Sequence, residues 1–267
     1  MPFAKPSFGA MMANGAQFTI PGLTVSAATV AGNVVTLTTS TQANMMYTVT
    51  VAASVQDVLG SGVGTPNTAT FNGFACTTNA LVISSVYGAG GNSGAVFTND
   101  FVELHNRSNA TVYLGGLSVQ YASATGTWSV NNTHPLPDAG VPAGGYFLIT
   151  FAGGVNSTTT LPVPDFDRDA GTNLSAASGK LVLVDGVTPI TGTCPYDAGV
   201  TNVIDMLGYG TTNCAEGNGA AGLSTANALT RNGTGCNDSQ SNAGDFTAAA
   251  AVAPKNLAST PNVCTCP

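Results

Sequence analysis

The segment 98–106 constrains the fold more than any other part of the sequence, because its hydrophobicity alternates with a period of two residues. In an extended strand, Phe101, Glu103 and His105 would face one side and the residues between them would face the other. Turn-forming residues stand on both sides of the segment, including the glycine-rich run 88–94. The segment is therefore predicted to be a central strand of a half-buried sheet that carries one carboxylate.

The rest of the chain repeats this pattern of short β-prone runs separated by Gly, Asn or Pro turns. Glycine accounts for 33 of 267 residues, about 12% against a usual ~7%. Long charged helix formers are scarce, with 6 Lys plus Arg and 13 Asp plus Glu. Because helices favour such residues and strands favour Thr and Val, the predicted fold class is all-β.

The charge balance argues against a nucleic-acid binder. The formal net charge is −7 and the isoelectric point is near 4.3, so the few cations cannot supply the basic footprint that phosphates require. No apolar run is long enough to predict a membrane span. The first residues lack the basic and apolar regions of a signal peptide, so we expect a mature or shortened fragment of a longer protein.

The cysteines indicate disulfides and an oxidising compartment. Their even number suits a disulfide framework, although many connectivities are compatible with it. A zinc site is disfavoured, because the closely spaced pair is C-x-C and neither histidine lies near a cysteine in sequence. The chain is therefore predicted to be extracellular or periplasmic. The cysteines are Cys76, Cys194, Cys214, Cys236, Cys264 and Cys266.

Residues 1–74 form a first predicted unit of short strands, with a hairpin that turns at residues 32–33. Its motifs are Phe18 and Gly60 with residues 21–25, 34–37, 47–49, 55–58 and 69–71. These motifs resemble the C-terminal two-thirds of a bacterial Ig-like domain, of the kind found in surface-layer and other exported proteins. The family's usual first two strands should precede Phe18, and residues 1–17 are too few and too irregular to supply both.

A sandwich without its early strands exposes unpaired backbone groups along a sheet edge, which proteins ordinarily avoid. Two explanations stay open at this point. Either truncation removed the missing strands, or a neighbouring copy supplies them by donor-strand complementation. In the second case, the donor would be the residues before Phe18 or the tail 248–267, which begins with the apolar run 248–253.

A second, larger unit is predicted for residues 80–258, after a linker at 75–79 and before a cysteine-containing tail at 259–267. Its motifs include Asn106 and Trp128 with residues 81–88, 92–94, 98–104, 117–121, 142–148, 178–184, 192–195, 205–210, 213–217, 235–238 and 245–246. They resemble a lamin-tail domain of the bacterial exported type, which implies an Ig-like β-sandwich. The chain is thus expected to hold two tandem Ig-like sandwiches, the first one incomplete.

The resemblance also implies disulfide partners. Cys194 and Cys214 both belong to the family pattern and flank the strand around residues 205–209, which implies that they pair. The ends of a sandwich often lie close together. Cys76 and Cys236 would therefore pair with the two cysteines of the tail, in an order that stays open.

Structural roles are implied for the remaining polar residues. Asp100, Glu103 and Glu216 are expected to hold turns and cap backbone N–H groups, not to form an acid–base pair. His105 stands where family members commonly carry an aromatic or apolar residue, and we expect it to be half-exposed. His134 is expected to be exposed and without function, and no Gly-x-Ser-x-Gly motif accompanies it. No catalytic residues are predicted, and the chain is not expected to be an enzyme.

The best candidate for a metal site is the loop that carries Asp165, Asp167 and Asp169. Alternating carboxylates suit Ca²⁺, which prefers hard oxygen ligands. The match to an EF-hand loop is poor, since Ala170 and Ala176 occupy its glycine and closing glutamate positions. An exposed acidic loop without an ion is the alternative, and no other cofactor is expected.

The predicted function is that of a non-catalytic extracellular module with a structural, adhesive or assembly role in a bacterial surface or secreted protein. Its partners would be other protein copies or a surface matrix, and strand complementation could join copies into filaments. One alternative is an accessory module of a secreted nuclease or phosphoesterase whose catalytic domain lies outside these residues. Another is a carbohydrate- or matrix-binding module, for which exposed aromatic residues such as Tyr87, Tyr113 or Tyr196 would need to form a flat platform.

Overall fold

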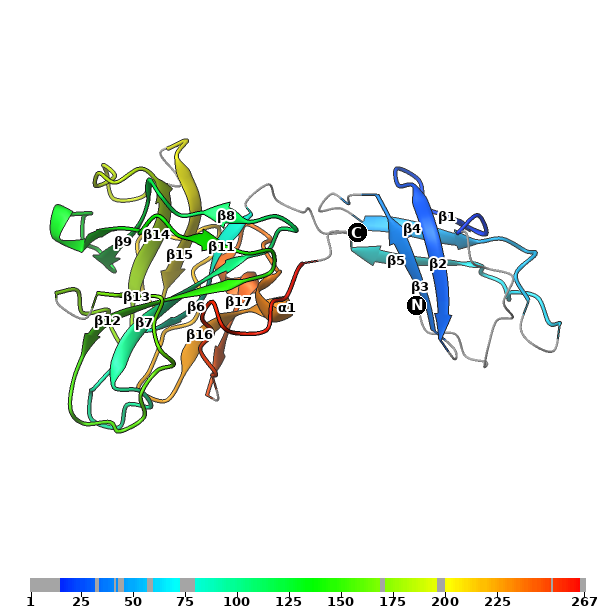
Figure 1. Cartoon of the computed structure of the whole chain (residues 1–267). Coiled ribbons are helices and arrows are strands. Elements are labelled where there is room, and N and C mark those ends of the chain that lie inside the picture. Colours follow the sequence, from blue (N-terminus) through cyan, green and yellow to red (C-terminus); the bar gives the residue numbers. More distant parts are fainter. Residues whose placement is uncertain are drawn as a thin grey trace. The chain divides into compact units, whose positions relative to one another are not determined.

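The chain divides into two compact units, Met1–Cys76 with Thr265–Pro267 (unit 1) and Thr77–Cys264 (unit 2). The computed structural model describes residues 15–31, 34–40, 42, 46–56, 60–72, 80–168, 171–195, 200–250 and 252–264. Figure 1 shows the strands of both units. In these ranges, no helix is both long and apolar enough to cross a membrane.

Unit 1 contains a three-stranded sheet and a β-hairpin. The sheet has the order β1 (Phe18–Thr19), β4 (Met46–Val51) and β5 (Thr68–Asn72), and the hairpin pairs β2 (Val25–Ala31) with β3 (Val34–Thr39). Along β4, Tyr47, Val49 and Val51 are buried and alternate with more exposed residues, as a strand with one covered face requires. The predicted hairpin is confirmed, because Val30 pairs with Val35 across it.

Unit 2 is built from two larger sheets and a short ribbon, so the predicted all-β class is confirmed. One sheet has the order β10 (Thr133–Pro135), β9 (Leu117–Ser123), β14 (Gly179–Asp185) and β15 (Val203–Tyr209). The other has the order β13 (Phe166–Asp167), β12 (Tyr146–Gly153), β7 (Asn99–Asn106), β6 (Leu81–Tyr87), β16 (Ala228–Arg231) and β17 (Phe246–Ala249). The ribbon pairs β11 (Gly140–Val141) with β8 (Val112–Tyr113), and the helical turns are η1 (Val130–Asn132), α1 (Asn232–Gly235) and α2 (Asn242–Asp245).

The main core of unit 2 lies between these two sheets. It combines Val102 and Leu104 of β7 with Val119 of β9 and Leu181 and Leu183 of β14, all of them buried. These five residues are 0% exposed. Trp128 packs in a separate cluster on the other face of β14.

The central strand β7 is buried on both faces, so the prediction of a half-buried sheet is wrong. Its inner face packs in the core, and its outer face is covered by the C-terminal segment 252–264, red in Figure 1. The backbone N–H of Lys255 donates a hydrogen bond to Glu103, and the carbonyl of Asn262 lies 2.8 Å from Nε2 of His105. The prediction of a half-exposed His105 is therefore also wrong, because this segment buries the ring completely.

These contacts also show where the tail 248–267 lies, which is the second of the two segments considered as a strand donor. Residues 246–249 form β17 and pair with β16 of their own unit, and 252–264 lie against β7 and β12. The part of the tail 248–267 that the structure describes thus packs within unit 2.

Candidate functional site

A cluster of buried charges lies at one edge of the unit 2 sandwich. Asp205, in the middle of β15, is in phase with Leu207 and Tyr209, so it points inward toward the facing sheet. Arg231 ends β16 in that facing sheet and is 1% exposed. The cluster therefore joins the two sheets through charged groups, beside the apolar core that lies between them.

Asp205 and Arg231 together bind the backbone of Ile83. The N–H of Ile83 donates to Oδ2 of Asp205 at 2.6 Å, and Nε of Arg231 donates to the Ile83 carbonyl at 2.8 Å. Nη2 of Arg231 completes the arrangement with a 2.7 Å ion pair to the same Oδ2. The pairing of β6 with β7 shifts register between Ile83 and Ser85, and such a bulge disrupts the ladder locally. The ion pair between Asp205 and Arg231 therefore supplies hydrogen-bond partners for the N–H and the carbonyl of Ile83 at the bulge.

Two further carboxylates and a second guanidinium surround Arg231. Asp238 accepts a hydrogen bond from Nη2 of Arg107 at 3.1 Å, and its Oδ1 lies 3.8 Å from Nη1 of Arg231. Asp245 lies 4.0 Å from the same Nη1 and accepts hydrogen bonds from the backbone of Ser239. All these side chains are buried, so their charges act on one another with little screening by water.

Two carboxylate oxygens in this cluster have no hydrogen-bond partner. Oδ1 of Asp205 and Oε2 of Glu216 are both buried and unpaired. One ligand atom from each of Asp205, Glu216 and Asp238 can be chosen so that all three lie within 4.8 Å of one another. Burial, and after it the negative charges of Asp205 and Asp238, raise the pKa of Glu216 to about 9. Chemically, the cluster can hold a proton or a metal cation.

Sequence reasoning missed this cluster, although one signal was present. In a strand with strict alternation, the carboxylate of Asp205 shares the phase of the core residues Leu207 and Tyr209. A buried carboxylate needs a partner, and a buried arginine is a natural one in a chain with few cations. Glu216 and Asp238 lie in loops, where no periodicity predicts which way a side chain points.

The three carboxylates considered from the sequence as an acid–base pair do not come together. Asp100 accepts hydrogen bonds from the backbone of Gly90 and Leu174, and Glu103 accepts them from Ser84 and the backbone of Lys255. The predicted structural role of these two residues is therefore confirmed. The prediction is wrong for Oε2 of Glu216, which caps no backbone group.

His134 is buried, so the prediction of an exposed side chain is wrong. Its Nε2 lies 2.8 Å from Oγ1 of Thr172, and Arg168 donates from Nε to its Nδ1 at 3.4 Å. Burial and the charge of Arg168 lower the pKa of His134 to about 4. A catalytic triad needs a carboxylate at Nδ1, and an arginine occupies that place, so the pair with Thr172 does not form a charge-relay arrangement.

The predicted calcium loop is only partly described. Asp165 accepts hydrogen bonds through Oδ2 from the backbone of Leu148 and Leu257, and Asp167 accepts one from Oγ1 of Thr150. Both carboxylates thus serve as structural acceptors in this loop. Asp169 lies outside the described residues, and calcium binding here stays a prediction.

Two disulfides hold unit 2. Cys194 is bonded to Cys214 with a Cα–Cα distance of 5.1 Å, and Cys236 is bonded to Cys264 at 5.5 Å. The second bond ties the C-terminal segment to the loop after α1. Cys76 and Cys266 lie outside the described residues.

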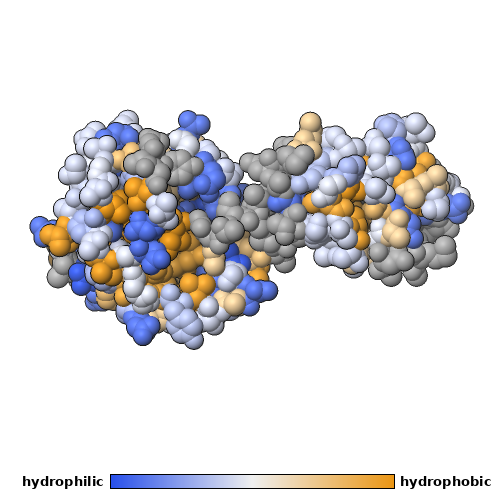
Figure 2. Space-filling view, turned by 90° about the horizontal axis from the view of Figure 1, so that it is seen from above, coloured by the Kyte–Doolittle hydropathy of each residue, from blue (hydrophilic) through white to orange (hydrophobic). Residues whose placement is uncertain are grey.

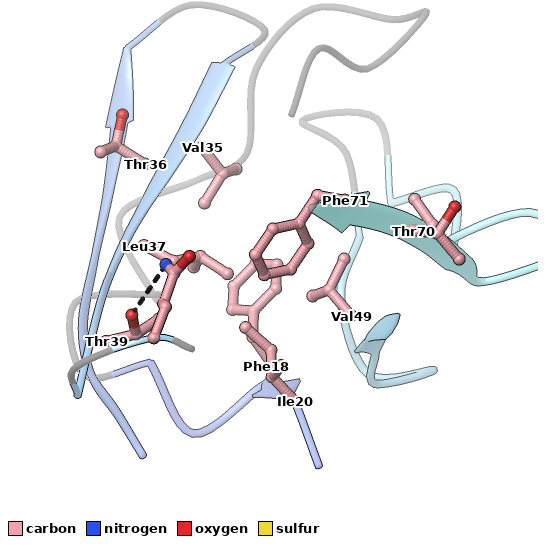
Figure 3. A pocket seen from close by; sticks show the side chains of 11 residues that line it. Phe18, Ile20, Val35, Thr36, Leu37, Thr39, Val49, Thr70 and Phe71 are labelled. Atoms are coloured by element: carbon pink, nitrogen blue, oxygen red, sulfur yellow. Dashed lines mark hydrogen bonds between the residues drawn. The ribbon is translucent and has the colours of Figure 1, made fainter. Parts of the chain in front are cut away.

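Unit 1 contains an apolar cleft of about 460 Å³ between the hairpin and the three-stranded sheet. In Figure 3, Leu37 of β3 and Phe18 and Phe71 of the sheet point toward one another across it. Gln42 lies on the cleft wall and donates to Oγ1 of Thr39, whereas its buried Oε1 has no partner. The full lining is Phe18, Ile20, Val35, Thr36, Leu37, Thr39, Gln42, Val49, Ala69, Thr70 and Phe71.

Two of the three tyrosines considered for an aromatic platform, Tyr87 and Tyr113, lie in the described residues. Tyr87 is 1% exposed and packs between Phe97 and Phe101, so it cannot contact a ligand at the surface. Tyr113 is exposed, and Tyr196 lies outside the described residues. Tyr87 is therefore excluded from such a platform, and a carbohydrate-binding role stays a prediction.

Comparison with known proteins identifies the family. The profile described as the Lamin Tail Domain matches residues 75–210. Among solved structures, the chain is similar to a DUF4876 family protein from Bacteroides thetaiotaomicron, with 14% sequence identity and a TM-score of 0.43 over 92% of this chain and 95% of that chain. No curated protein matches. Because the profile covers more than half of its length, the chain belongs to the lamin tail domain family.

Proposed function

We propose that this chain is a non-catalytic structural module of a bacterial extracellular or cell-surface protein, and that copies of it associate through the cleft in unit 1. The observation that carries the proposal is the contrast between the two cores. Leu104 and Leu183 in unit 2 are 0% exposed, whereas Leu37 and Phe71 in unit 1 remain partly exposed around the cleft. Association that covers these side chains would remove apolar surface from water and stabilise unit 1.

The chemistry of the cleft favours an extended peptide strand as its occupant. The walls are mostly aliphatic and aromatic, and the unpaired Oε1 of Gln42 is a buried acceptor among them. A strand offers apolar side chains on one face and backbone N–H donors along its length. A purely apolar ligand would leave the Gln42 oxygen unsatisfied, which costs free energy.

The donor that we propose is the segment 3–13 of a second copy. This segment carries Phe3, Phe8, Met11 and Met12 among small residues and has one charge, at Lys5. The tail is the weaker candidate, since its described residues are bound to their own unit. The first unit would then be an Ig-like domain completed by a neighbour, as in donor-strand complementation.

The surface and the disulfides support an extracellular structural role. On the face drawn in Figure 2, strongly hydrophilic residues are scattered among apolar and weakly polar ones, in keeping with only 6 Lys plus Arg and 13 Asp plus Glu in the chain. Disulfides such as Cys194–Cys214 form and persist in oxidising compartments. Two covalent links in unit 2 suit a protein that must last outside the cell.

Light scattering on the unreduced full chain tests this proposal. We expect dimers or longer assemblies for the wild type, and monomers for Leu37→Glu and for a variant without residues 3–13. Val155→Glu is the matched control, because Val155 is 93% exposed in unit 2 and should not affect association.

Two outcomes would contradict the proposal. A monomeric wild type whose amides in β4 and β5 resist hydrogen exchange would show that unit 1 needs no partner. Association that survives removal of residues 3–13 would show that another segment or another surface is responsible. A synthetic peptide of residues 3–13 that binds the shortened variant with micromolar affinity would identify the donor directly.

A further inference from the structure

We propose that Asp205, Glu216 and Asp238 of unit 2 bind one Ca²⁺ ion, which links the two sheets of the sandwich. This site is separate from the loop that carries Asp165 and Asp167. It is also independent of the cleft in unit 1, so the two proposals can fail separately.

Two carboxylate oxygens of the cluster lack a hydrogen-bond partner. Oδ1 of Asp205 and Oε2 of Glu216 are buried, in residues only 1% and 3% exposed, and accept no hydrogen bond. A buried carboxylate oxygen without a partner is costly, and native structures rarely leave one. Here two of them belong to one cluster, so a single ligand can satisfy both.

The distances between the three carboxylates suit a bound calcium ion. Ca²⁺ binds oxygen at 2.3–2.6 Å, so oxygens on opposite sides of one ion are about 5 Å apart. One atom from each of Asp205, Glu216 and Asp238 lies within 4.8 Å of the other two. These separations are compatible with three oxygens that bind one ion.

The cluster contains more carboxylates than guanidinium groups. The carboxylates of Asp205, Glu216, Asp238 and Asp245 act on Arg231, and one further guanidinium, Arg107, pairs with Asp238. With all carboxylates ionised, two negative charges remain uncompensated in a region that excludes water. One divalent cation neutralises them. Arg231 holds Oδ2 of Asp205, and Arg107 and Gln240 hold the two oxygens of Asp238 in place.

The ligand set selects calcium among the common cations. All the ligand atoms are carboxylate oxygens, which suit hard cations and not zinc or copper. The site is buried, so the ion must lose most of its water, and Mg²⁺ does this reluctantly. Because Asp205 lies in the four-stranded sheet and Asp238 follows α1 beside the six-stranded one, the bound ion would join both sheets.

Calorimetric titration of the full chain with CaCl₂, after removal of metals with EDTA, tests the site. We expect one ion per chain, binding at least tenfold tighter than Mg²⁺, and a rise of about 5 °C in the unfolding temperature of unit 2 at saturating Ca²⁺. Absence of both binding and stabilisation in the wild type would overturn the proposal, and would mean that a proton on Glu216 neutralises the cluster instead.

Two matched variants locate the ion. Glu216→Gln keeps the size of the side chain and removes its charge, and we expect it to weaken calcium binding at least tenfold. Asp167→Asn removes a carboxylate from the loop of the other predicted site, and we expect it to leave this binding unchanged. The reverse pattern, with binding lost in Asp167→Asn and kept in Glu216→Gln, would overturn the assignment.

Discussion

The backbone N–H of Lys255 donates a 2.6 Å hydrogen bond to Oε2 of Glu103, across 152 positions of sequence. Glu103 lies on the outer face of the central strand β7 and also accepts a 2.6 Å hydrogen bond from Oγ of Ser84. This carboxylate therefore positions the C-terminal segment on the sheet. Burial raises the pKa of Glu103, while the hydrogen bonds from Ser84 and Lys255 oppose that rise.

Replacement of Glu103 should loosen the C-terminal segment. Glu103→Ala removes the acceptor of two buried hydrogen bonds, so we expect a loss of about 2–4 kcal/mol in the free energy of unfolding. Glu103→Gln keeps one carbonyl acceptor and should cost less. Hydrogen exchange checks the local effect: the Lys255 amide should exchange faster in both variants, and an unchanged rate would contradict this role.

The two disulfides of unit 2 should differ in what they protect. They close loops of similar length, with sequence separations of 20 and 28, so loss of either should cost about 3–4 kcal/mol by the chain-entropy relation. Only the double variant Cys236→Ser with Cys264→Ser should expose residues 252–264 to proteases. The double variant Cys194→Ser with Cys214→Ser is the control, and equal cleavage of the segment in both would contradict the assignment.

The sandwich of unit 2 could be predicted because its signal is local. Alternating apolar residues such as Leu181 and Leu183 predict a strand and its buried face, and the residues between strands predict turns. The burial of the outer face of β7 could not be predicted in this way. The segment that covers it contributes backbone groups, such as the N–H of Lys255 and the carbonyl of Asn262, and backbone groups leave no pattern in a sequence.

The candidate site also combines a residue that the sequence pattern could have indicated with residues that it could not. Asp205 stands out in sequence, because it shares its phase with the core residues of β15. Glu216 and Asp238 come from loops, and their proximity to Asp205 depends on how those loops pack. Asp238 follows Asp205 by 33 positions in the sequence, and nothing in the sequence indicates that their carboxylates meet. Only the folded structure brings them together.

His134 should make the stability of unit 2 depend on pH. Its pKa in the fold is about 4, lowered first by burial and then by Arg168, whereas the unfolded value is about 6.5. The unfolded chain thus binds more protons between these values, and the contribution of the neutral ring is complete above pH 6.5 and is lost as pH falls toward 4. We expect a loss of up to about 3 kcal/mol across this window.

His134→Asn isolates this effect from the titration of other groups. Asparagine retains hydrogen-bonding capacity toward Thr172 and Arg168 but does not titrate. The difference in unfolding free energy between wild type and variant, measured by denaturant titration at pH 7.5 and at pH 4.5, should therefore shrink at the lower pH. Parallel stability curves across this range would show that the ring takes up its proton equally in both states.

The close approach of two loops at Gly91 gives the sharpest test of the fold of unit 2. Gly91 has φ +67°, and an added Cβ would overlap the backbone of Gly154. Gly192 has a similar φ of +84° with nothing within 4 Å of the added atom, so it is the matched control. Gly192→Ala should cost about 1–2 kcal/mol from left-handed backbone strain alone.

Gly91→Ala should lower the free energy of unfolding clearly more than Gly192→Ala does. The added Cβ would push the loop at Gly91 away from Gly154, and hydrogen bonds hold that loop in place. The N–H of Gly91 donates to the Phe97 carbonyl at 3.0 Å, and its own carbonyl accepts from Nδ2 of Asn156 at 2.9 Å. Denaturant unfolding followed by the fluorescence of Trp128, the single tryptophan of the chain, reports on unit 2 alone. Both substitutions introduce the same left-handed backbone strain. Equal denaturation midpoints for the two variants would therefore show that the loops at Gly91 and Gly154 do not meet.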